Sequence, residues 1–185
     1  MRKHSLIPGL IILITGCFIF QSAASQALSN EEIKKIMADD WVRAKAYTQE
    51  YLNTMPGDKY SYKAMDSLRS FAQQMLHLAS ANVFLMSAAT DQPPASWASF
   101  SLEGRTSAQS SDSVNYFVGA SYDYCINAVK NCDPGKWKEK KTMFGFETTK
   151  FALLLKAFEH QTHHRGQTTI YIRLNDIRPP QEKLF

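Results

Sequence analysis

The chain has 185 residues, of which 44% are hydrophobic and 21% are charged, and its formal net charge is +4 at pH 7. The positive charge is small, and it is neither gathered into a basic run nor interleaved with aromatic residues, so nucleic acid is not expected as a partner. The length corresponds to one ordinary domain that can bury its own core.

The N-terminal residues have the pattern of a secretory signal peptide. A basic start, MRKH, precedes a short apolar run over residues 6–20, and small residues follow as far as Ala27. The run is too short for a comfortable transmembrane helix, and the whole pattern is typical of a signal that is removed on export. We therefore expect a signal peptide over residues 1–27 and a mature domain over residues 28–185. The mature chain should have no transmembrane span and should be periplasmic or secreted.

A second processing route is also open at the N-terminus. The stretch ITGC at residues 14–17 resembles a bacterial lipobox, in which Cys17 would become a lipid-anchored N-terminal residue. Cleavage there would cut the apolar run in its middle, so simple cleavage after Ala27 is the favoured prediction. Both routes place the protein outside the cytoplasm.

Hydrophobic residues recur at helical spacing in four segments of the mature chain. They predict helices over residues 30–54, 67–89, 111–131 and 148–174. The basic and aromatic stretch 136–147 is expected to form an irregular cover over one end of these helices. The pattern predicts an all-α fold, a compact four-helix bundle of the kind that builds metal sites from side chains on facing helices.

The two cysteines of the mature chain, Cys125 and Cys132, are seven positions apart. At 1.5 Å per helical residue their Cα atoms would be roughly 10 Å apart. A disulfide needs less than about 7 Å. Both are therefore expected to be buried free thiols.

Three of the five histidines, His160, His163 and His164, lie within the run FEHQTHHRGQ. On a helix, positions four apart share a face, with Cβ atoms roughly 5–6 Å apart, so His160 and His164 can direct two imidazoles at one ion. His163 is rotated by about 100° from its neighbour and cannot easily join them. His77 is the internal histidine left as a third ligand, because His4 lies in the predicted signal peptide.

The histidine pair could be a metal site or two buried imidazoles held by hydrogen bonds. Burying two imidazoles without a metal or partners is costly, which favours the metal. A zinc protease is disfavoured, because its motif needs a glutamate directly after the first histidine and this position holds Gln161. No nucleophile elbow of the GxSxG type occurs. Three further polar candidates, each more often a surface, capping or core residue, are Asp123, Glu147 and Tyr171.

The last predicted helix resembles that of a known family. The run HQTHHRGQ at 160–167, followed by YIRLN at 171–175 and a Pro-Pro pair, is similar to the HxxHHRGQ ending of the DinB/YfiT-like family. The stretch LHLASAN around His77 resembles the histidine motif in helix two of that family. Asp176 departs from the pattern, since glycine is common there, and many relatives lack an export signal.

The resemblance implies a DinB/YfiT-like bundle of up-down-down-up topology that holds a divalent metal ion with three histidines. Carried over residue by residue, the ligands are His77, His160 and His164, and zinc or nickel is the expected ion. Residues that would contact these ligands or pack the helix are His163, Arg165 and Gln167.

Three protein ligands leave one position for water or substrate, which is typical of a catalytic zinc site. We therefore expect a metal-dependent enzyme that acts on a small molecule. Some relatives resemble thiol-dependent transferases and isomerases, so the resemblance suggests thiol transfer. Export disfavours that chemistry, because small thiols are mainly cytoplasmic. Hydrolysis by a metal-activated water is the alternative reaction for such an enzyme.

The alternative is a non-catalytic metal-binding or metal-stabilised bundle, and a homodimer is compatible with either function. A cavity that reaches the open metal position would favour the enzyme. A metal sealed by Phe and Leu side chains would favour the binding module.

Overall fold

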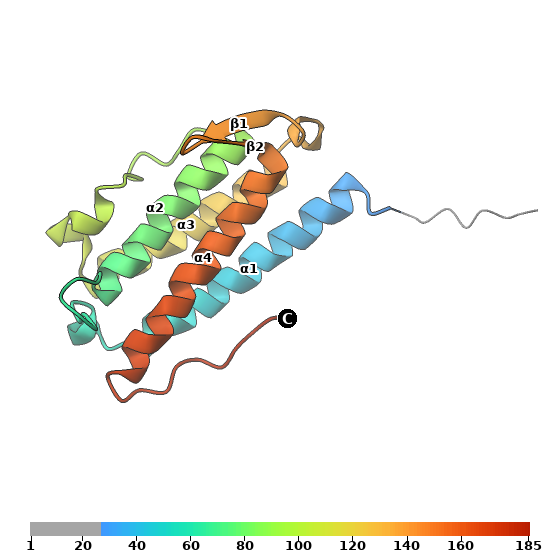
Figure 1. The fold of residues 1–185 in the computed structure, drawn as a ribbon. Coiled ribbons are helices and arrows are strands. Elements are labelled where there is room, and N and C mark those ends of the chain that lie inside the picture. The colour runs from blue at the N-terminus through green and yellow to red at the C-terminus, as the bar shows by residue number, and fades with distance from the viewer. Residues whose placement is uncertain (1–26) are drawn as a thin grey trace, which may run out of the picture.

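A computed structural model describes residues 27–185 of the chain. Its four long helices are α1 (Asn30–Thr54), α2 (Phe71–Thr90), α3 (Ser111–Asn131) and α4 (Lys150–Arg173). In Figure 1, α1 and α4 run in one direction along the bundle and α2 and α3 run in the other. The predicted all-α four-helix bundle with up-down-down-up topology is thus confirmed. The connection between α2 and α3 returns along the whole bundle, which makes these two helices parallel.

Side-chain caps decide where the first two long helices begin. The Ser29 side chain accepts a hydrogen bond from the Glu32 amide, and the Glu32 carboxylate accepts one from the Ser29 amide at 2.8 Å, as in a capping box. Ser70 and Gln73 form the same arrangement before α2. Because Ser70 caps the helix, α2 begins at Phe71 and not at the predicted residue 67.

The stretch before α4 is a β-hairpin, so the prediction of irregular structure there was wrong. Strands β1 (Lys140–Met143) and β2 (Phe146–Thr149) pair antiparallel, with Met143 opposite Phe146. The intervening turn residues have positive φ angles, 51° at Phe144 and 84° at Gly145, as a type I′ hairpin turn requires. The hairpin does lie over one end of the bundle, where α2 ends and α4 begins (Figure 1).

The core lies between the four helices, and α2 is buried around most of its circumference, as its composition predicts. Trp41 of α1 is buried in this core against the rings of Tyr122 and Phe158, at centroid distances of 5.7 and 5.3 Å. Cys125 and Cys132 are buried free thiols, as predicted.

The predicted signal peptide, with Cys17 and His4, lies outside the described residues except for Ala27. Within residues 27–185, every helix is too short or too polar to cross a membrane.

Candidate metal centre

Helices α2 and α4 bring His77, His160 and His164 together. One ring nitrogen from each lies within 4.8 Å of the other two, and the ring centroids are 4.4 to 5.4 Å apart. Nitrogens bound to one zinc ion at about 2.0–2.1 Å can be at most about 4.2 Å apart. Small rotations of the rings would therefore bring the three nitrogens onto one ion.

Two of the rings are oriented by acceptor groups from neighbouring residues. Glu103 Oε2 lies 2.7 Å from His77 Nδ1, and Gln74 Oε1 lies 3.2 Å from His164 Nδ1. An oxygen acceptor at Nδ1 favours the tautomer that carries its proton there, which leaves Nε2 with a lone pair to offer a metal ion. The carboxylate of Glu103 also accepts a hydrogen bond from Arg69 Nε at 3.0 Å, so Glu103 is itself held in place.

The third ring has a nitrogen without a partner. Within residues 27–185, His160 Nδ1 is buried and makes no hydrogen bond. A buried polar atom without a partner costs free energy, and a cation bound at this nitrogen would offset that cost. Three imidazoles form a donor set that suits zinc, nickel, copper or iron, so the residues present fit a divalent transition-metal ion.

The environment keeps all three rings neutral near pH 7, which ligation requires. Burial, reinforced by the neighbouring His77 and His163, lowers the pKa of His160 to about 4. Burial and then the His160 ring lower the pKa of His164 to about 3. Burial and the Arg69 guanidinium also lower the pKa of His77, against the opposing effect of Glu103.

The remaining residues of the helix-four motif have separate places. His163 is exposed, and its Nε2 accepts a hydrogen bond from Gln167 Nε2 at 2.8 Å. Gln167 also accepts a hydrogen bond from Gln74, so it supports the residue that orients His164. Arg165 points into the core, where its guanidinium lies 4.5 Å from the centre of the Tyr47 ring. These positions agree with supporting and packing roles.

The three further polar candidates lie apart from the histidine nitrogens. Asp123 forms an ion pair with Lys45, at 2.6 Å, at the surface. The buried Tyr171 donates its hydroxyl proton to the Arg69 carbonyl oxygen at 2.7 Å. Glu147 lines the nearby cavity but pairs with Lys140, at 2.7 Å.

Sequence reasoning missed Glu103 and Gln74, the two residues that orient the rings. Glu103 lies in the connection between α2 and α3, on a short 3₁₀ turn at Leu102–Gly104. No local periodicity marks a loop residue of this kind, and only the tertiary fold places it against His77. Gln74 could have been found, because it lies three positions before His77 on the same helix.

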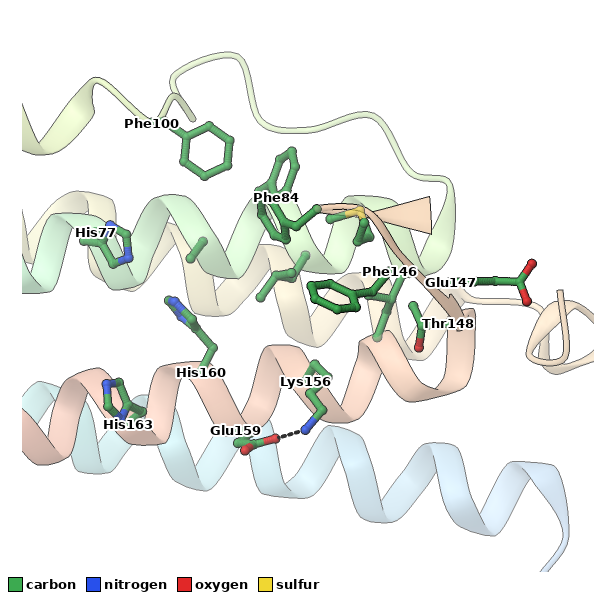
Figure 2. A pocket seen from close by; sticks show the side chains of 15 residues that line it. His77, Phe84, Phe100, Phe146, Glu147, Thr148, Lys156, Glu159, His160 and His163 are labelled. Atoms are coloured by element: carbon green, nitrogen blue, oxygen red, sulfur yellow. Dashed lines mark hydrogen bonds and ion pairs between the residues drawn. The ribbon is translucent and has the colours of Figure 1, made fainter. Parts of the chain in front are cut away.

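An apolar cavity of about 810 Å³ opens next to the histidines, between α2, α4 and the hairpin. Figure 2 shows His77 and His160 at one end of this cavity, with Phe84, Phe100 and Phe146 around it. Its size lies within the range of roughly 300–1,000 Å³ that is typical of small-molecule sites. Because the cavity is lined by two of the three candidate ligands, a molecule inside it can approach the metal position.

A second cavity, of about 500 Å³, lies on the other side of the histidines and is polar. Along α2, Gln74 of the polar cavity comes before His77, and Phe84 of the apolar cavity comes after it. Along α4 the order is reversed, as expected for antiparallel neighbours, with Leu153 in the apolar cavity and Gln167 in the polar one. The histidine cluster therefore separates two cavities of different chemistry.

Comparison with known families agrees with this arrangement. The sequence model of the DinB family matches residues 28–181. The chain belongs to the DinB family. The match spans almost all of the predicted mature domain, so the bundle and the histidine cluster both lie within the DinB region.

Two crystal structures show the same fold. A DinB-like protein from Bacillus cereus ATCC 10987 superposes with a TM-score of 0.63 at 16% identity, over 80% of this chain and 97% of that chain. A DinB-like protein from Bacillus subtilis, YjoA, gives a TM-score of 0.60 at 19% identity, over 81% of this chain and 96% of that chain. A search of curated proteins found no match. At these identities the likeness supports the bundle fold alone.

Proposed function

We propose that this DinB-family protein is a metal-dependent enzyme in which His77, His160 and His164 hold one divalent ion, zinc or nickel. The observation that carries the proposal is the convergence of three imidazoles at the end of a cavity large enough for a small molecule. Three protein ligands leave a coordination position open. When bound, the ion would supply a Lewis acid that polarises a substrate oxygen or activates a water or thiol.

The surrounding residues prepare the site for this role. Glu103 and Gln74 hold the rings of His77 and His164 through their Nδ1 atoms. Burial keeps His160 and His164 neutral, and the cavity beside the cluster is lined mainly by apolar side chains. A purely structural metal would not need a cavity that reaches its ligands, which favours the enzyme over the metal-stabilised bundle.

The family resemblance favours thiol transfer over hydrolysis as the chemistry at this ion. Lys63 and Arg69 line the polar cavity together with Asp66 and Glu103, so its positive and negative charges balance and do not select an anionic substrate. Hydrolysis is the second candidate, because the predicted export would separate the protein from the cytoplasmic thiol pool.

Turnover should depend on the metal and on its ligands. We expect the mature protein, purified without a His-tag and loaded with zinc or nickel, to catalyse either displacement of chloride from 1-chloro-2,4-dinitrobenzene by a small thiol or hydrolysis of p-nitrophenyl esters. The His160→Ala, His164→Ala double variant should show only the background rate, because it lacks two ligands. A wild type that binds the metal stoichiometrically but is inert in both assays would instead favour the non-catalytic metal-binding module.

Glu103→Gln should weaken metal binding without unfolding the protein. The variant keeps the shape of the side chain but loses the charge that supports the His77 ring at 2.7 Å. Loss of such a partner typically lowers metal affinity by about 10- to 100-fold, which competition with a fluorescent chelator would measure. Glu147→Gln is the matched control, because Glu147 pairs with Lys140. Equal affinities for both variants would show that Glu103 does not position the ligand.

A further inference from the structure

Four phenylalanines from three separate parts of the chain form one wall of the apolar cavity. Phe84 belongs to α2, Phe100 to the connection that follows it, and Phe144 and Phe146 to the hairpin. The rings of Phe84 and Phe100 are 4.6 Å apart, and those of Phe84 and Phe144 are 6.0 Å apart. We call these four residues the phenylalanine wall.

The wall is apolar surface that the fold leaves open. Phe100, Phe144 and Phe146 are 56%, 75% and 76% exposed. Contiguous exposed apolar surface next to a cavity is a mark of a ligand-binding groove. The exposed phenylalanines therefore indicate that the cavity receives an apolar ligand.

The backbone at Phe144 supports this interpretation independently. Its φ angle of 51° lies in the left-handed region, which disfavours bulky side chains. The first central position of a type I′ turn is normally Asn, Asp or Gly. Phe144 departs from this local preference while its side chain lines a cavity. Departures of this kind are expected at functional sites.

The charged groups at the edge of the cavity neutralise one another. Lys156 pairs with Glu159 at 2.5 Å, and Glu147 pairs with Lys140 at 2.7 Å. Figure 2 shows the Lys156–Glu159 pair beside α4 and Glu147 pointing away from the histidines. The body of a ligand in this cavity would therefore meet carbon surface and ring faces.

We propose that the apolar cavity binds a substrate with an uncharged hydrophobic body, aromatic or alkyl, whose single polar head group reaches the three histidines. The head-group part of this inference rests on the proposed metal site, and the body part rests on the phenylalanine wall. The substrate class is thus a drug-sized hydrophobic molecule with one donor group at its end. Sugars, nucleotides and small polyacids lack the apolar body that this cavity would bury.

The first test uses the neutral fluorescent probe N-phenyl-1-naphthylamine and the mature protein. The probe should bind saturably at one site per chain, with or without metal. On the metal-loaded protein, straight-chain hydroxamates from acetohydroxamate to decanohydroxamate should displace it. Each added methylene should strengthen displacement by roughly threefold to fourfold, as burial of one methylene predicts. Displacement that does not depend on chain length would overturn the proposal.

A variant of the wall separates binding from folding. Phe144→Asn with Phe146→Thr should weaken probe binding at least tenfold, because both side chains line the cavity. Asparagine suits a positive φ angle and threonine suits a strand, so Tm should not fall. Tyr116→Ser is the matched control, since Tyr116 is a 64% exposed aromatic residue on α3. Equal weakening in the control, or none in the wall variant, would overturn the role of the wall.

Failure of this inference is distinguishable from failure of the proposed enzyme. Metal content measured by mass spectrometry on the same samples reports on the histidine cluster alone. If metal binds but the probe does not, the substrate class is wrong and the metal centre stands. If the protein takes up no metal, probe binding by the wild type and its loss in the wall variant still support the hydrophobic body, whereas absence of probe binding removes it.

Discussion

The His160→Ala, His164→Ala double variant should lose the metal-dependent rise in Tm that we expect of the wild type. An ion that binds only the folded chain stabilises it by about 2.7 kcal/mol at one hundred times its dissociation constant. For a domain of roughly 150–250 residues, each kcal/mol shifts Tm by about 2–4 °C, so the wild-type rise should be roughly 5–11 °C. Thermal unfolding of chelator-treated protein, with and without added zinc or nickel, measures it.

Single variants of the adjacent histidines provide the control. His163→Ala should retain the rise, because His163 is exposed and contacts Gln167, whereas His164→Ala should lose most of it. Equal loss in both folded variants would contradict the assignment of His164 as the ligand. A wild type without any metal-dependent shift, after verified removal of bound metal, would remove the three-histidine site altogether.

The fold could be predicted because its signals are local. The helical spacing of apolar residues and the capping box of Ser29 and Glu32 predict the first and last residues of α1 correctly. The hairpin was missed because its turn carries Phe144 and Gly145, whereas the usual hairpin signal is Asn-Gly. A sequence pattern detects a turn that follows local preference, and the Phe-Gly pair departs from that preference.

The candidate site could be predicted only in part, for a related reason. His160 and His164 share a helix, so their spacing alone places them together, and His77 followed from its inward face and the family resemblance. The partner of His77 could not be found in this way, because Glu103 is 26 positions away in an irregular connection. Contacts of this kind exist only after the loop has docked against the helices.

Electrostatics at the site also required the structure. Ordinary imidazoles titrate near pH 6.5, and the sequence alone predicts protonation of an empty site below about pH 6. Burial and mutual proximity lower the pKa values of His160 and His164 to about 4 and about 3. The fold thus keeps the rings neutral and available to a cation over a wider range of pH than free histidine would allow.

Keeping these rings neutral has a cost that appears when the metal is absent. The unfolded chain binds protons at these histidines below about pH 6.5, whereas the fold resists protonation down to pH 3–4. Between those limits the unfolded state binds more protons, so stability falls as pH falls. The stability contributed by the neutral rings is fully present above pH 6.5 and is lost progressively as pH decreases toward the folded pKa values.

We therefore expect the Tm of the metal-free wild type to fall more steeply between pH 7.5 and pH 4 than that of the metal-free His160→Ala, His164→Ala variant. We discount the pKa shifts for solvent screening on the cavity side of the rings and keep about one pKa unit per ring. At about 1.4 kcal/mol per unit, this gives about 3 kcal/mol for the pair. At about 2–4 °C per kcal/mol, the two curves should diverge by roughly 6–12 °C at pH 4. Circular dichroism melts of both chelator-treated proteins measure the difference. Carboxylate protonation lowers the Tm of both proteins alike, so its effect cancels to first order in the comparison. Parallel curves would mean that these two imidazoles titrate in the folded chain as they do in the unfolded one, which would remove the basis for a preformed, neutral ligand set.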